Sequence, residues 1–186
     1  MKCNLLGNKL AIYGITQNAK TNEYLMVLQY SNNGNLHKYL STKFRELTWQ
    51  IRLKLLLNIS EDLYDIHKGG YIHADLHSGN ILQDRHISKG MQSYISDLGL
   101  SRKYDENTSG DIYGVLPYVA PEVLSGKEFT KKADIYGFGV IMSEISTGQR
   151  PFDGCKFDIS LAIKICKGLQ PEFALGTPNY YIKFAK

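Results

Sequence analysis

One stretch decides the fold: residues 71–82, which read YIHADLHSGNIL. Three polar side chains, His73, Asp75 and Asn80, stand there between apolar residues. The apolar ends of the stretch are typical of short buried strands. A turn held between two strands would place Asp75 and Asn80 on the same side. A carboxylate can accept a hydroxyl proton and an amide oxygen can ligate a metal, so the turn predicts a site with both abilities.

A second aspartate follows the stretch. Asp97 follows the apolar pair Tyr94-Ile95 after one serine and precedes Leu98 and Gly99, and a glycine permits backbone angles that other residues avoid. The order H-x-D-x-x-x-x-N and then D-x-G resembles the catalytic and metal-binding loops of protein kinases. The resemblance implies that Asp75 is the catalytic base and that Asn80 and Asp97 bind Mg²⁺ with ATP. It places His77 near the transferred phosphate.

The first motif also occurs in small-molecule phosphotransferases such as the aminoglycoside kinases, so downstream residues discriminate between the families. Residues 120–122 resemble the A-P-E that closes a protein kinase activation segment. Residues 134–140, DIYGFGV, resemble the helix beneath the active site of protein kinases. Small-molecule kinases lack both motifs. The resemblance covers nearly the whole chain and implies an α+β, protein kinase-like fold, with a partial small-lobe β-hairpin and a mostly α-helical large lobe.

The resemblance also divides the chain. Residues 1–30 correspond to a remnant of the small lobe, residues 31–35 to the hinge, and residues 36–186 to a large lobe that lacks its last helices. We read strands at 10–15 and 24–30, a hairpin with a polar loop. The nucleotide contacts that the resemblance implies are Gln29, Ser31, Asn35 and Leu82.

Helical spacing of apolar residues is clearest over 48–67, where Thr48 is a plausible N-cap and Gly69-Gly70 a plausible stop. His73 and Asp134 are expected to have structural roles, Asp134 by capping amides of the catalytic loop. The polar segment 83–93 predicts a hairpin turn, and residues 101–113 resemble a mobile activation loop. Further helices are expected over 35–40, 134–148 and 157–167 and from Pro178 onward.

Composition limits the function classes. A formal charge of +4 over 186 residues, with no run of five like charges, gives no argument for nucleic acid. The three cysteines are far apart and fit neither a disulfide framework nor a metal site. No apolar run approaches membrane-spanning length, so a cytoplasmic protein without a membrane segment is the default expectation.

Several departures from the kinase pattern leave alternatives open. No G-x-G-x-x-G precedes the hairpin, and Lys2 and Lys9 lack the context of the phosphate-binding lysine. Ala74 stands where many kinases carry an Arg that pairs with a loop phosphate, His77 where Ser/Thr kinases carry a Lys, and Val115 where they carry a Thr. The leading interpretation is a partial protein kinase domain acting on Ser/Thr, or Tyr, of a protein substrate. The alternatives are an inactive kinase-like binding or scaffold module and a small-molecule phosphotransferase.

Overall fold

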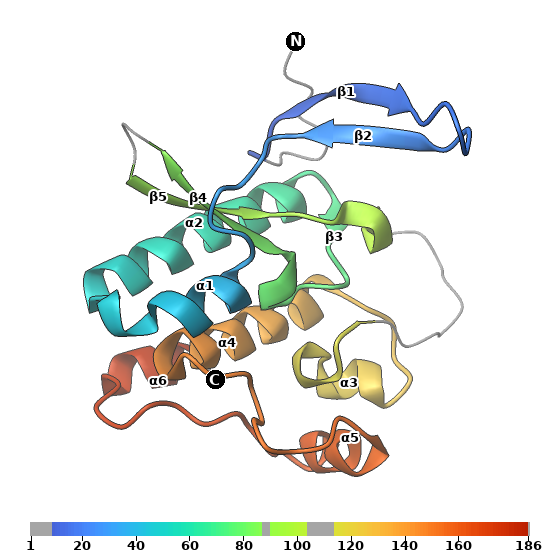
Figure 1. Ribbon diagram of the computed structural model, residues 1–186. Helices are drawn as coiled ribbons and strands as arrows, with labels where there is room; N and C mark the ends of the chain where they lie inside the picture. The colour runs from blue at the N-terminus through green and yellow to red at the C-terminus, as the bar shows by residue number, and fades with distance from the viewer. Residues whose placement is uncertain (1–8, 87–89, 104–113, 186) are drawn as a thin grey trace.

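The computed structural model describes residues 9–86, 90–103 and 114–185. A β-hairpin stands at one end of the molecule, above a helical body (Figure 1). The hairpin pairs β1 (Ile12–Gln17) with β2 (Tyr24–Leu28) in antiparallel register. This confirms the predicted hairpin, although β1 begins two residues later than predicted. Its strands expose nearly all their side chains, apolar ones included.

The helical body contains every helix that the sequence predicts and one short helix, at 121–124, that it does not. In chain order these are α1 (Leu36–Lys43), α2 (Trp49–Lys68), α3 (Pro121–Leu124), α4 (Lys131–Thr147), α5 (Ile159–Cys166) and α6 (Asn179–Ala185). The predicted N-cap is confirmed, because the Thr48 hydroxyl accepts the Ile51 amide of α2 at 3.3 Å. Gly148, in a left-handed conformation with φ 73°, ends α4. None of the helices in the described ranges is long and apolar enough to cross a membrane.

Short strands carry the central stretch. β3 (Tyr71–Ile72) pairs with β6 (Arg102–Lys103), and β4 (Ile81–His86) pairs with β5 (Gly90–Ile95). The hairpin predicted over 83–93 is therefore confirmed, but most of that range is strand: residues 83–86 and 90–93 are paired, and residues 87–89 lie outside the described residues. The polar side chains mislead because they are paired inside the fold: Ser93 Oγ donates to Gln83 Oε1 at 3.0 Å, and both residues are buried.

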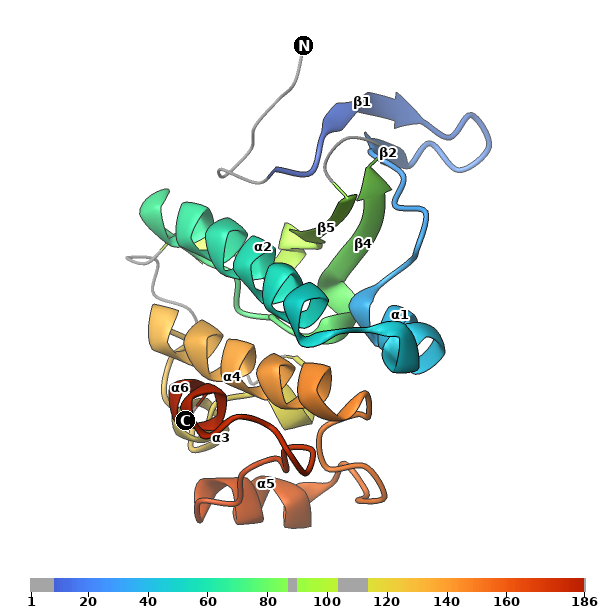
Figure 2. The ribbon, with the colours of Figure 1, turned by 90° about the vertical axis from the view of Figure 1, so that its left-hand side faces the viewer.

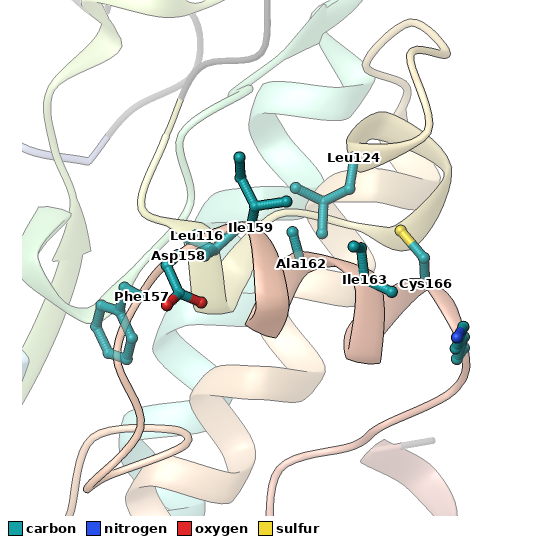
Figure 3. Close-up of a pocket in the computed structure, with 9 residues that line it drawn as sticks. Leu116, Leu124, Phe157, Asp158, Ile159, Ala162, Ile163 and Cys166 are labelled. Atoms are coloured by element: carbon teal, nitrogen blue, oxygen red, sulfur yellow. The ribbon is translucent and has the colours of Figure 1, made fainter.

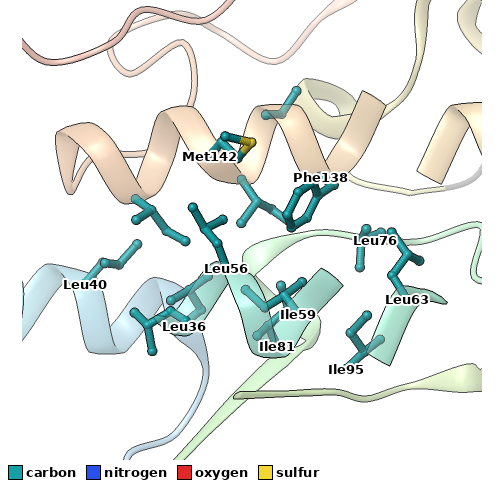
Figure 4. Packing of buried hydrophobic residues seen from close by; sticks show 14 of the residues in the cluster. Leu36, Leu40, Leu56, Ile59, Leu63, Leu76, Ile81, Ile95, Phe138 and Met142 are labelled. Atoms are coloured by element: carbon teal, nitrogen blue, oxygen red, sulfur yellow. The ribbon is translucent and has the colours of Figure 1, made fainter. Parts of the chain in front are cut away.

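The core forms where α2 crosses α4 (Figures 2 and 4). Ile59 and Leu63 of α2 lie in one buried cluster with Phe138 and Met142 of α4. Ile81, at the end of the central stretch, belongs to the same cluster and is fully buried. The central stretch is thus anchored by its apolar end in the buried core.

Candidate active site

Asp134, at the start of α4, holds the beginning of the central stretch in place. Its Oδ2 accepts the His73 amide at 2.8 Å and its Oδ1 accepts the Ala74 amide at 3.0 Å. His67 Nε2 lies 2.8 Å from Oδ2 as well. These bonds confirm the predicted capping role of Asp134. They also support Ala74 in a left-handed conformation, φ 65°, which residues with a Cβ seldom adopt.

His73 has the structural place that the sequence predicts. The side chain is fully buried, and burial lowers the pKa of His73, which favours the neutral ring. Nδ1 accepts the Asp75 amide at 3.2 Å, so the ring proton is on Nε2, which donates to the Ser96 carbonyl at 3.1 Å. The ring therefore links the central stretch to the segment that carries Asp97.

Asp75 and Asn80 lie on the same side of the turn, as predicted. Asn80 Nδ2 donates to the Asp75 carbonyl at 3.0 Å and to Asp75 Oδ2 at 3.1 Å. One carboxylate oxygen of Asp75 is thereby held, while the other, Oδ1, is buried and has no hydrogen bond to the described residues. The arrangement orients a carboxylate and leaves one oxygen able to accept a proton.

His77 is next to this oxygen. Its Nδ1 accepts the Gly79 amide at 3.0 Å, so the ring proton is on Nε2, and Nε2 lies 3.6 Å from Asp75 Oδ1. The separation is too long for a hydrogen bond, but the proton is on the side of the carboxylate. His77 thus lies beside the Asp75 carboxylate, and its contact with a phosphate stays a prediction.

The two candidate metal ligands are brought close by the chain that follows Asn80. The Asn80 carbonyl accepts both the amide and the hydroxyl of Ser96, each at 2.8 Å, and Ser96 directly precedes Asp97. Asp97 is exposed and left-handed, φ 59°, with Oδ1 accepting the Gly99 amide at 3.3 Å. Asn80 Oδ1 has no hydrogen bond to the described residues.

These oxygens suit Mg²⁺. An amide oxygen and a carboxylate are hard donors, and Mg²⁺ usually takes one or two such ligands and keeps several waters. Within the described ranges, no group of three or more His, Cys, Asp or Glu side chains could hold a metal ion, so a site closed by protein ligands alone is not found there. The residues present therefore fit a metal ion that takes only some of its ligands from the protein and the others from a phosphate and from water.

The structure places the predicted nucleotide contacts along one seam between the hairpin and the large lobe. Asn35 bridges to Leu82 of β4, and Gln29 Nε2 donates to Asp84 Oδ2 of β4 at 3.1 Å. Ser31 Oγ is buried without a hydrogen-bond partner among the described residues. Asn35 Oδ1 caps α1 by accepting the Lys38 amide at 2.9 Å, which leaves only its amide nitrogen for a ribose. The four nucleotide contacts stay predictions.

The segment before A-P-E passes directly by the catalytic carboxylate. A Cβ on Gly114 would lie 3.1 Å from Asp75 Oδ1, so glycine keeps this approach open. Most of the predicted activation loop, residues 104–113, lies outside the described residues. Farther along, an apolar groove of about 610 Å³ opens between Leu116 and α5. Figure 3 shows Ile159 and Ala162 of α5 in this groove, across from Leu124.

The sequence analysis missed a buried hydrogen-bond chain beside the site. The Tyr118 hydroxyl lies 3.0 Å from Ser78 Oγ and donates to Glu144 Oε2 at 2.6 Å. Burial, first, and the Glu144 charge raise the pKa of Tyr118, so this hydroxyl stays protonated. The available signal was Glu144 itself, the one charged residue within the segment 135–148.

A model of the family described as protein tyrosine and serine/threonine kinase matches residues 6–177, nearly the whole chain. The chain belongs to the protein kinase family. This agrees with the loop geometry above and confirms the predicted kinase-like fold. It also separates the chain from the small-molecule phosphotransferases that the first motif left open.

Several curated relatives are similar to this kinase domain. It is 34% identical over 156 residues to "Probable serine/threonine-protein kinase roco5" of Dictyostelium discoideum, covering 78% of this chain and 6% of the relative. It is 34% identical over 149 residues to "Calcium/calmodulin-regulated receptor-like kinase 1" of Arabidopsis thaliana, covering 77% of this chain and 33% of the relative. Phytosulfokine receptor 1 of Arabidopsis thaliana is 33% identical over 144 residues, or 73% of this chain and 14% of the relative. The kinase domain thus spans a third or less of these proteins.

Proposed function

We propose that this kinase domain transfers the γ-phosphoryl group of ATP, with Mg²⁺, to a Ser or Thr hydroxyl of a protein substrate in signal transduction, with Tyr as the other acceptor that the site admits. The observation that carries the proposal is the state of Asp75. One of its oxygens is held by Asn80, and the other is buried, has no hydrogen bond to the described residues and lies beside the segment that leads to A-P-E. A substrate hydroxyl at this oxygen would be oriented and could give up its proton.

The remaining residues position this centre. Asn80 holds Asp75 through its amide nitrogen and keeps its oxygen for Mg²⁺, to which Asp97 would add a carboxylate. When bound, Mg²⁺ and ATP supply the phosphoryl group and neutralise the charge that develops during its transfer. Ser31, Gln29, Asn35 and Leu82 would hold the nucleoside along the seam described above.

A thermal-shift titration with Mg²⁺-ATP tests the nucleotide site. We expect saturable stabilisation of this 186-residue chain, because a ligand that binds only the folded state raises its stability by mass action. Asp97→Ala should lose most of the shift, and Asp153→Ala, at an exposed aspartate that is not among the predicted metal ligands or nucleotide contacts, should keep it. No shift in the wild-type chain would contradict the proposed Mg²⁺-ATP site.

A phosphate-transfer assay with protein substrates tests the chemistry. Asp75→Asn should bind Mg²⁺-ATP like the wild type and lower the rate of transfer by at least about a hundredfold, since it removes the proton acceptor. Binding of Mg²⁺-ATP by the wild type without transfer to any protein would favour the alternative of a non-catalytic binding module.

A further inference from the structure

A hollow of about 330 Å³ lies beside the Asp75 carboxylate. Residues from the hinge exit, α1, the catalytic turn, the segment before A-P-E and the segment after α4 line it: Asn35, His37, His77, Ser78, Gly79, Val115, Tyr118, Arg150, Pro151 and Phe157. None of these residues is acidic, and Arg150 is a permanent cation. The lining is therefore positively charged, whereas a pocket that binds a basic side chain would be negatively charged.

Glu144, a buried acid behind the wall of the hollow, already has partners for both of its oxygens. Glu144 is 1% exposed, and its Oε2 accepts the Tyr118 hydroxyl while its Oε1 lies 2.9 Å from His37 Nδ1. His37 Nε2 accepts Arg150 Nε–H at 3.1 Å, which puts the His37 proton on Nδ1, from where it donates to Glu144. Both carboxylate oxygens of Glu144 are thus occupied behind the wall of the hollow.

Arg150 is left able to bind an anion. It is exposed, and its single hydrogen bond within the described ranges uses Nε, so both terminal nitrogens of the guanidinium have no partner there. The bond through Nε limits the orientations of the guanidinium plane. A planar guanidinium with two free terminal nitrogens matches a carboxylate well. The aspartate of the neighbouring apolar groove, Asp158, caps α5 by accepting the Leu161 amide at 3.2 Å.

The hollow is adjacent to the reaction centre. His77 lines it and lies 3.6 Å from Asp75 Oδ1, and Val115 lines it and directly follows Gly114, which approaches Asp75. A peptide with its acceptor hydroxyl at Asp75 would pass the mouth of the hollow within a few residues of the acceptor.

We propose that this hollow is a specificity pocket in which Arg150 binds an Asp or Glu side chain of the protein substrate, close in sequence to the phosphorylated residue. The proposal rests on the proposed kinase function of the same site. It goes further by naming the substrate class, acidic peptides, and the residue that selects it. His37 and Glu144 act as positioning residues that hold the guanidinium.

Fluorescence anisotropy can test the pocket without any phosphate transfer. Serine-containing peptides carry one Glu at each flanking position in turn, and matched peptides carry Gln or Arg there. At one or more positions the wild type should bind the Glu peptide about fivefold more tightly than the Gln peptide, and the Arg peptide more weakly still. Arg150→Gln should remove the preference, and Arg150→Glu should reverse it towards the Arg peptide. Lys183→Gln, an equal loss of charge on α6, should change nothing.

Two further measurements keep the outcomes separate. Asp75→Asn should retain the Glu preference while transfer is lost, so a failure of catalysis and a failure of the pocket are distinguishable. In the wild type, added salt should shrink the preference, a result that does not depend on any variant folding. Equal binding of Glu and Gln peptides by the wild type at every position, or an unchanged preference in a folded Arg150→Gln variant, would overturn the proposal.

Discussion

The Asp62 side chain in the middle of α2 is completely buried. Its Oδ2 accepts the Ile95 amide of β5 at 3.1 Å, and its Oδ1 lies 3.4 Å from Lys9 Nζ. Burial is the largest influence and raises the pKa of Asp62 from 3.8 to about 6, in spite of the bond to Ile95 and the charge of Lys9. The charged form of Asp62 is therefore disfavoured in the fold.

The pH dependence of stability follows from this shift. Because the folded state binds the Asp62 proton more tightly than the unfolded state, the contribution of Asp62 is fully present below pH 3.8 and is lost as the pH rises through about 6. Asp62→Asn imitates the protonated form and can still accept the Ile95 amide. At pH 8 we expect the variant to be more stable by on the order of 1–3 kcal/mol, measured by urea denaturation. Asp153→Asn, at an exposed site, is the control, and an equal gain there would contradict the explanation.

Ala74 offers a second prediction for a single residue. Its left-handed backbone, φ 65°, costs a residue with a Cβ roughly 1 kcal/mol, and glycine avoids this cost. Ala74→Gly should raise the free energy of unfolding by about 0.5–1 kcal/mol. The same substitution at Ala133, inside α4, should lower it by about 1 kcal/mol or more. Destabilisation by both changes would show that the Ala74 methyl group contributes more than its backbone strain costs.

At the scale of elements, α4 positions the catalytic stretch through Asp134. Two amides of the stretch donate to this carboxylate, one to each oxygen, and His67 reaches it from the end of α2. In Asp134→Asn, an NH₂ group replaces one of the two carboxylate oxygens. In either position it faces a backbone amide that needs an acceptor, that of His73 or that of Ala74. We expect a loss of about 2–3 kcal/mol in the free energy of unfolding, because a buried donor is left without an acceptor.

Asp158→Asn is the matched control for this change. Asp158 caps α5 through one oxygen, which accepts the Leu161 amide at 3.2 Å. Since Asn is about as good an N-cap as Asp, little stability should be lost. Losses of similar size for the two variants would mean that Asp134 acts only as a helix cap.

The elements were predictable where local pattern and tertiary packing agree. α2 combines apolar spacing with Thr48 before it and Gly69 after it, and α4 is apolar on nearly all sides because it lies in the core. Only the start of β4 was predicted; the length of β4 and β5 was not, because Gln83 and Ser93 look like turn residues unless their hydrogen bond to each other is known. Burial of a hydrogen-bonded polar pair leaves no trace in a local pattern.

The candidate site shows the same limit. The order and spacing of Asp75, Asn80 and Asp97 pointed to the catalytic turn. The chain of bonds from Tyr118 through Glu144 and His37 to Arg150 was not found, since it joins residues that are 26, 107 and 113 positions apart. Contacts at such separations depend on the finished fold.

For the molecule as a whole, the β1–β2 hairpin is the least protected part. Ile15 and Met26 are paired across the strands, and they are 72% and 54% exposed. A two-stranded sheet with apolar faces and open edges can pair with another copy. Ile15→Lys combined with Met26→Glu should lower light scattering of concentrated protein, with little change in melting temperature. Leu175→Lys, at an exposed leucine outside any strand, should leave the scattering unchanged.

Trp49, the single tryptophan, packs edge-on against Tyr181 of α6, with the ring centroids 5.2 Å apart. The Arg52 guanidinium lies over the indole ring, 5.1 Å from its centroid. The first residue of α2 therefore carries a native fluorophore whose surroundings depend on the last helix. Release of α6 alone would expose the indole to water and shift its emission to longer wavelength, while circular dichroism from the other helices would persist. The protein thus contains an optical reporter for the docking of α6.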